Sequence, residues 1–107
     1  MRNILIALAL LVSGCAHHPD GNDRIMRRIE AAVSLPQGSA PLSHYRRHYA
    51  WANDQEGMVR AVYVQGGKPI RLWLAWDEMP IVLDGGCEVV SFSYDVHTER
   101  VSPARCN

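Results

Sequence analysis

Two histidines in the middle of the chain have the spacing of a metal site. His44 and His48 would share one face of a helix, as zinc-binding pairs do, but Tyr45 stands where the metalloprotease motif has a glutamate. On a strand they would again share a face, about 13 Å apart at ~3.3 Å per residue, too far for one metal. His17 and His18 supply only two ligands and leave a zinc site incomplete. We therefore expect His44 and His48 to face solvent and no metal to be bound.

Side chains suited to catalysis are present but scattered. A nucleophilic serine needs a base that a third group orients, and no such motif surrounds the three serines of the C-terminal part: Ser91, Ser93 and Ser102. Four carboxylates could supply an acid–base pair of the glycosidase type, but they lie beside predicted turns, where solvated charges are typical: Asp77, Glu78, Asp84 and Glu88. No glycine-rich phosphate loop is present. The sequence predicts no catalytic residue and no cofactor.

Cys15 follows a basic start and an apolar run. Arg2 is charged, and residues 4–12 are all apolar. This run is too short to cross a bilayer, which takes ~20 residues, but is typical of a signal-peptide core. The stretch Val12-Ser13-Gly14-Cys15 resembles the lipobox of bacterial lipoproteins. The resemblance implies cleavage before Cys15, a diacylglyceryl group on its thiol, and acylation of the new amine by palmitate or a related chain.

The same resemblance implies a location and a division of the chain. Residues 1–14 would be the signal peptide, 15–22 the acylated cysteine and a flexible tether, and 23–107 a single domain. In the enterobacterial sorting pattern an aspartate after the cysteine retains a lipoprotein in the inner membrane, so Ala16 favours the outer membrane. Two or three acyl chains hold a protein on a membrane almost permanently. We expect the domain on the periplasmic side, lipid-anchored through Cys15.

Export would place the other two cysteines in an oxidising compartment. With Cys15 acylated, Cys87 and Cys106 are the remaining thiols. A four-residue loop at residues 95–98 would set these two opposite each other on antiparallel strands. Cα atoms of opposed residues lie ~4.5 to 5.5 Å apart, within the range of a disulfide. The sequence predicts a disulfide between Cys87 and Cys106.

These residues belong to an expected α+β domain. Apolar residues at helical spacing predict one N-terminal amphipathic helix at about residues 23–34, between a capping Asn22 or Asp23 and a stop at Pro36. Residues 42–52 fit either a strand or a helix, and their aromatic content favours a strand. We expect the helix to pack on a three- to five-stranded antiparallel meander sheet. This outline is similar to cystatin-like and NTF2-like folds.

Two apolar runs around Gly66-Gly67 predict a β-hairpin over residues 58–76. If Leu72 and Leu74 face the helix, alternation turns Trp73 outward and leaves it substantially exposed. Three residues would then share the outer face, which we interpret as a partner surface: Arg60, Arg71 and Trp73.

Charges balance over the whole chain but not along it. There are 11 basic and 11 acidic side chains, so no net positive field favours nucleic acid. Residues 24–71 hold eight basic and three acidic side chains, whereas residues 72–99 hold six acidic and no basic ones. The two halves either complement each other across the fold or form a polarised binding face.

A second resemblance concerns the part after the tether. It is similar to small proteobacterial lipoproteins without an assigned activity, which share a tyrosine-rich middle, an Asp-Gly-Gly-Cys turn and a C-terminal Cys-Asn. The matching positions are Tyr45, Tyr49, Tyr63, residues 84–87 and residues 106–107. This similarity supports the domain boundary and implies no mechanism.

Two function classes remain. The first, which we prefer because so small a domain rarely has spare core volume, is an interaction module that binds an envelope protein or peptidoglycan. The second is a small-ligand-binding or hydrolytic protein with a cavity between helix and sheet, lined by Tyr45, Tyr49 and Trp51. An apolar cavity of about 300 Å³ or more with convergent polar groups would favour the second class. A filled core with an exposed aromatic patch would favour the first.

Overall fold

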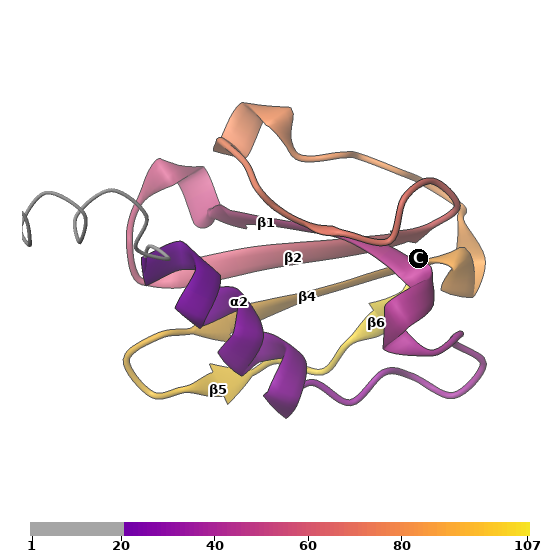
Figure 1. The fold of residues 1–107 in the computed structure, drawn as a ribbon, viewed down its shortest axis with the longest axis horizontal. Helices are drawn as coiled ribbons and strands as arrows, with labels where there is room; N and C mark the ends of the chain where they lie inside the picture. The colour runs from indigo at the N-terminus through magenta and orange to yellow at the C-terminus, as the bar shows by residue number, and fades with distance from the viewer. Residues whose placement is uncertain (1–20) are drawn as a thin grey trace, which may run out of the picture.

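The computed structural model describes residues 21–107 and shows an α+β domain. One helix, α2 (Gly21–Ala32), lies across one face of a six-stranded sheet (Figure 1). The strands are β1 (Tyr45–Trp51), β2 (Met58–Gln65), β3 (Arg71–Trp73), β4 (Val89–Asp95), β5 (Arg100–Val101) and β6 (Arg105–Cys106). The predicted signal peptide, Cys15 and the histidines at 17 and 18 lie outside the described residues.

Helix α2 forms where apolar spacing predicts it, two residues nearer the N-terminus at both ends. Its first turn therefore includes residues 21–22, which we expected in the tether. Met26 and Ile29 are buried against the sheet. Asp23 accepts a hydrogen bond from Arg27 Nε at 2.9 Å, an i,i+4 pair that supports the exposed side of the helix.

The sheet is mixed, so the expected purely antiparallel meander is wrong. Its order is β3-β1-β2-β4-β5, with β6 also beside β4. Strand β2 pairs antiparallel with β1 over seven residue pairs and with β4 over seven more. Strand β3 pairs with β1 over three residues and runs parallel to it. The ambiguous stretch at residues 42–52 contains strand β1, as its aromatic content predicts.

The hairpin predicted over residues 58–76 is therefore wrong. Gly66 (φ 90°) and Gly67 (φ 76°) do form a turn in the left-handed region that favours glycine. Both edges of β2, however, are occupied by seven-residue partners, and a three-residue strand cannot displace either of them. The chain instead continues to the free edge of β1, where Leu74 N donates a hydrogen bond to Tyr49 O at 2.8 Å.

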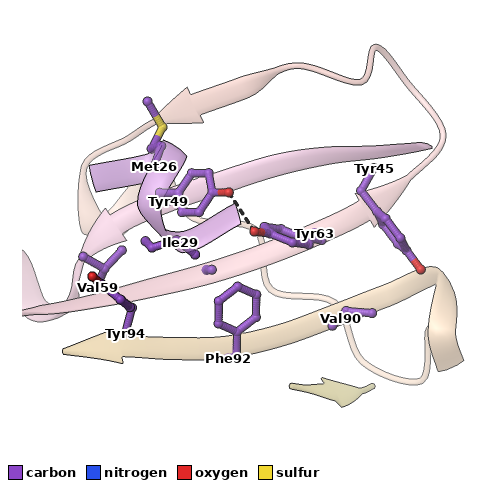
Figure 2. Packing of buried hydrophobic residues seen from close by; sticks show 10 residues of the cluster. Met26, Ile29, Tyr45, Tyr49, Val59, Tyr63, Val90, Phe92 and Tyr94 are labelled. Atoms are coloured by element: carbon purple, nitrogen blue, oxygen red, sulfur yellow. Dashed lines mark hydrogen bonds between the residues drawn. The ribbon is translucent and has the colours of Figure 1, made fainter. Parts of the chain in front are cut away.

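The face of the sheet toward α2 carries the core. Figure 2 shows aromatic side chains of neighbouring strands meeting beneath the helix. The buried cluster comprises Met26, Ile29, Tyr45, Tyr49, Val59, Ala61, Tyr63, Val90, Phe92 and Tyr94. Tyr63 and Phe92 stack edge to face with ring centroids 5.2 Å apart. Tyr45 and Tyr49 have no exposed surface, so they belong to a packed core and do not line the cavity expected between helix and sheet.

The two cysteines predicted to pair lie at disulfide distance, but not in the expected register. Cys106 is opposite Val90 on β4, and Cys87 lies in the 3₁₀ turn η4 (Gly86–Glu88) that precedes this strand. The turn brings the two Cα atoms to 4.4 Å, and the sulfur atoms are bonded. The disulfide therefore joins a turn to the last strand rather than two opposed strand positions.

The register differs by three positions, two of them because the preceding turn begins one residue later than expected and one because it shifts again between β5 and β6. Asp95 ends β4 and pairs with Arg100, so residues 96–99 form the loop. Oδ1 of Asp95 accepts hydrogen bonds from the backbone N–H groups of His97 (2.8 Å) and Thr98 (3.3 Å). Such an Asx turn fixes Asp95 as the last strand residue.

Candidate functional site

The three residues predicted to form a partner surface do not share a face. Because β3 runs parallel to β1, Arg71 and Trp73 align with the residues of β1 that point toward α2. Trp73 packs on Trp51 edge to face, with ring centroids 5.2 Å apart, and is partly buried against the core. Arg60 alternates with the core residues of β2 and lies on the opposite face. The predicted exposure of Trp73 and the joint surface are both wrong.

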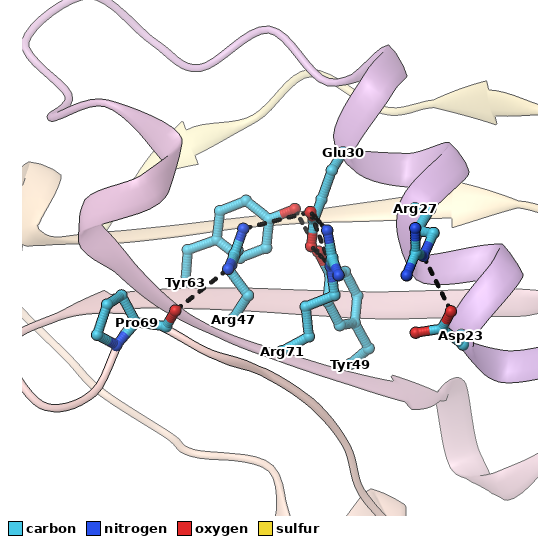
Figure 3. Close-up of polar contacts among 8 residues, drawn as sticks. All are labelled: Asp23, Arg27, Glu30, Arg47, Tyr49, Tyr63, Pro69 and Arg71. Carbon is cyan, nitrogen blue, oxygen red and sulfur yellow. Dashed lines mark hydrogen bonds and ion pairs between the residues drawn. The ribbon is translucent and has the colours of Figure 1, made fainter. Parts of the chain in front are cut away.

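A polar cluster lies where α2 meets the sheet (Figure 3). The carboxylate of Glu30, whose side chain is 8% exposed, accepts hydrogen bonds from Arg47 Nη1 (3.2 Å), Arg71 Nε (2.9 Å) and the Tyr49 hydroxyl (2.8 Å). The Tyr49 and Tyr63 hydroxyl oxygens are 2.7 Å apart. The cluster therefore links α2 to β1, β2 and β3.

The proton positions in this cluster follow from its chemistry. A carboxylate between two guanidinium groups only accepts hydrogen bonds, so Tyr49 donates to Glu30 and Tyr63 donates to Tyr49. Burial is the largest cause that raises the pKa of both phenols above the ordinary tyrosine range. The hydrogen bond to Glu30 is the largest cause that raises the pKa of Arg71. Both tyrosines remain protonated and act as donors.

Each carboxylate oxygen of Glu30 has two hydrogen-bond partners among the described residues. Its Oε1 atom accepts from Arg47 and Arg71, and its Oε2 atom accepts from Tyr49 and Arg71. A general base must reach the proton that it abstracts, and here the carboxylate is already fully engaged. We interpret the cluster as the link that holds the helix on the sheet. Sequence reasoning missed it, because its members are far apart in the chain.

The histidines considered as metal ligands lie in different surroundings. His44 is exposed in the 3₁₀ turn η1 (Leu42–His44). His48 is buried, contrary to the expected exposure, because Leu72 of β3 lies beside it; its Nδ1 is 2.9 Å from Val62 O. Within residues 21–107, no group of three or more His, Cys, Asp or Glu converges as a metal site would require.

The face of the sheet opposite α2 is partly covered by residues 74–88, orange in Figure 1. The segment is held at both ends. Trp76 N donates to Asp54 Oδ1 at 2.9 Å, and Gly86 N donates to Asn107 O at 2.7 Å. Between these points, Asn107 Nδ2 donates to the carbonyl of Val82. The C-terminal residue therefore fixes the covering segment against the sheet.

A cavity of about 580 Å³, here called the far-face groove, lies between this segment and the sheet. The sheet contributes Arg60, Val62 and Ser91, the segment contributes mostly apolar side chains, and Asn107 completes the lining. The segment's residues are Trp76, Asp77, Met79, Pro80, Ile81, Val82 and Leu83. Ile81 and Leu83 are 88% and 80% exposed. The groove is thus an apolar site with a few polar groups.

A second, more polar hollow of about 490 Å³ adjoins the far-face groove. The two share Arg60, Ser91 and Asn107, and the polar hollow adds Ser102 and Arg105. Arg60 therefore stands where an apolar and a polar hollow meet.

Sequence reasoning predicted Arg60 as a partner residue but assigned it the wrong neighbours. The short apolar run at residues 81–83, next to the Asp-Gly-Gly turn, was the signal for the covering segment. Four carboxylates were considered as an acid–base pair. One of them, Glu78, accepts a hydrogen bond from Ala75 N at 2.9 Å, which is the capping contact of a turn.

Comparisons of this chain with protein-family models, curated proteins and solved structures found no match. Among the described residues, no helix has the length and apolar character needed to cross a membrane. The far-face groove and the N-terminal sequence are therefore the features of the chain that bear on its function.

Proposed function

We propose that this chain is a membrane-anchored periplasmic lipoprotein whose domain binds an apolar ligand in the far-face groove. The observation that carries the proposal is the groove itself. Its volume of about 580 Å³ lies within the ~300–1,000 Å³ of ligand sites. Apolar side chains form most of its lining, and Arg60, Ser91 and Asn107 converge on it. This is the small-ligand class of function, with the site on the sheet face away from the helix.

The lining favours binding over catalysis. Its polar side chains are Arg60, Asp77, Ser91 and Asn107. A serine nucleophile needs a neighbouring base, most often an imidazole, and no histidine is among the described residues that line the far-face groove. The hydrolytic alternative therefore has no support from this site.

The lipid anchor is the second part of the proposal and rests on the lipobox resemblance at residues 12–15. Metabolic labelling with a palmitate analogue in a bacterial host should mark the wild-type protein and leave Cys15→Ala unmarked. Labelling that persists in the variant would refute the anchor but would leave the groove proposal intact.

A neutral naphthylamine dye that fluoresces in apolar surroundings tests the groove. Because Ile81 and Leu83 are exposed at the groove, the double change of Ile81→Ser and Leu83→Ser should weaken dye binding several-fold and leave the thermal midpoint almost unchanged. Ile70→Ser is the matched control, since Ile70 is exposed but lies outside the lining. Equal dye binding by all three proteins would contradict the proposal.

The exposure of Ile81 and Leu83 also favours a second candidate, a protein or peptidoglycan partner on this side of the domain. Photo-crosslinking in cells from position 81, with position 70 as control, tests it. A single protein or glycan adduct specific to position 81, together with no dye binding, would favour the interaction module.

A further inference from the structure

We infer that the ligand of the far-face groove is a single-chain carboxylic acid, with its carboxylate on Arg60 and its hydrocarbon chain along residues 76–83. This inference rests on the proposed function and names the ligand class. Three features of the groove support it. The guanidinium of Arg60 is unpaired, the acidic side chains on this face do not reach it, and the lining beside it is apolar.

The guanidinium of Arg60 has no partner in the part of the chain that the structure describes. Among residues 21–107, no carboxylate lies within ion-pair distance of this guanidinium, and no side chain or backbone group forms a hydrogen bond with it. Arg60 is nevertheless only half-exposed, on the central strand β2 between Ala50 and Ser93 of the neighbouring strands. A partly desolvated charge without a partner is unfavourable. An anion bound at this position would remove that penalty.

Two acidic residues on this side of the sheet, Asp95 and Asp77, do not supply such an anion. Asp95 lies on the same face of β4, two pairs further along, but its Oδ1 atom accepts two backbone hydrogen bonds in its own turn, which lower its pKa. Asp77 lines the far-face groove without reaching Arg60. Arg105 adds a second positive charge in the adjoining polar hollow. The local charge around Arg60 therefore favours an external acidic group.

The other end of the ligand is set by the apolar part of the lining. Trp76, Met79, Ile81 and Leu83 present hydrocarbon and ring surface, and Val62 forms the sheet side. Burying methylene groups against such a surface is favourable, because each one leaves water. A polar solute would lose its hydration there without gaining partners. The groove therefore fits a hydrocarbon chain that carries one acidic group at its end.

A carboxylate matches the site better than a phosphate. Among the described residues that line the far-face groove, Arg60 is the single arginine, and its planar pair of N–H donors fits one carboxylate in a bidentate manner. A phosphate monoester carries up to two negative charges, and Asp77 in the same lining would repel the second. The volume of about 580 Å³ is that of one small ligand rather than of a two-chain lipid.

Displacement of the neutral naphthylamine dye measures the specificity. The ligands are dodecanoic acid, dodecanol and dodecyl phosphate, each below its aggregation limit, at about pH 7, where the carboxylic acid is ionised. We expect the acid to bind the wild-type protein about ten-fold or more tightly than the alcohol, as a charge-assisted hydrogen bond predicts. Arg60→Gln should reduce the acid to the affinity of the alcohol and leave the alcohol within about two-fold.

Two further variants separate the role of the site from general charge. Arg60→Lys keeps the positive charge but loses the planar pair of N–H donors. It should therefore retain only part of the preference for the acid over the alcohol. Arg100→Gln removes one positive charge from exposed β5, outside both hollows, and should behave as wild type. Unchanged alcohol and dye binding by Arg60→Gln shows that the variant is folded.

The outcomes distinguish this inference from the proposed function. If acid and alcohol bind the wild-type protein equally, the acid specificity is wrong, whereas the apolar groove stands. If dodecyl phosphate binds ten-fold tighter than the acid, the ligand is not a carboxylate. If Arg60→Gln keeps the preference for acid, another residue recognises it. If neither the dye nor any of the three compounds binds, the proposed function also falls.

Discussion

The buried carboxylate of Glu30 provides the sharpest test of how the helix is held on the sheet. Glu30→Gln keeps the shape of the side chain and removes its charge. Three donors then lose the carboxylate: Arg47, Arg71 and the Tyr49 hydroxyl. The variant therefore leaves two guanidinium groups facing a neutral amide at the helix–sheet boundary.

The expected loss follows from how deeply each partner is buried. Removing one member of a buried ion pair costs ~3–5 kcal/mol, because the other charge stays desolvated. The Arg47 side chain is only 12% exposed, and its Nε atom is already buried without a partner. The Arg71 side chain is 34% exposed and can regain water, which reduces its share. We expect Glu30→Gln to lower the free energy of unfolding by about 3 kcal/mol, a large part of the ~5–15 kcal/mol of a typical domain.

Urea unfolding followed by circular dichroism, with the disulfide intact, measures this loss. Glu99→Gln is the matched control, because Glu99 forms an exposed pair with Arg28 at 3.8 Å, with side chains 65% and 59% exposed. Exposed pairs contribute ~0–1 kcal/mol, so the control should unfold almost like wild type. Equal stabilities for Glu30→Gln, Glu99→Gln and wild type would show that the polar cluster does not hold the helix.

Three further predictions concern the tyrosines and one glycine. Tyr49→Phe should destabilise by about 1–3 kcal/mol and more than Tyr63→Phe in urea unfolding, because only the former leaves both a buried hydroxyl and Glu30 short of a partner; the reverse order would contradict the assigned proton positions. Because burial raises the pKa of both phenols, the unfolded chain releases their protons near ~pH 10 while the folded chain keeps them. Stability should therefore be full below ~pH 10 and fall above it, and a urea midpoint constant to ~pH 11 would refute this. Gly85→Ala should destabilise the domain by ~1–3 kcal/mol and lower its thermal midpoint, because the new Cβ would lie 2.5 Å from Val89 Cγ2. Gly21→Ala is the control, since its Cβ meets no atom within 4 Å, and it should leave the thermal midpoint unchanged.

Features determined by neighbouring residues were predictable from the sequence. Apolar spacing predicted α2 to within two residues at each end, and Gly66-Gly67 predicted a turn with positive φ. The pairing of Cys87 with Cys106 was predictable from the cysteine count. The predicted pair is correct although the predicted strand register is wrong, because turn η4 brings Cys87 back to the last strand. Local periodicity and turn chemistry decide such features over a few residues.

The order of the strands was not predictable in the same way. A hairpin over residues 58–76 agrees with the local pattern, yet β2 already has two longer partners, and only the whole sheet reveals this competition. The resulting parallel position of β3 turned Arg71 toward Glu30 and Trp73 toward Trp51. The far-face groove was not predictable for the same reason. Its covering segment begins where β3 ends, so its place follows from the pairing of β3 with β1.

One feature of β2 did indicate that the sheet is covered on both faces. A strand with one solvated face alternates between apolar and polar residues, whereas Ala61-Val62-Tyr63 is apolar at three successive positions, and all three are buried. Strand β4 alternates instead, with Ser91 and Ser93 half-exposed on the face away from α2. The covering segment, residues 74–88, therefore extends over the far face of β2 but leaves that of β4 partly exposed. The far-face groove lies at this boundary, where Val62 and Ser91 are neighbours, so its position follows from a pattern that the sequence already contains.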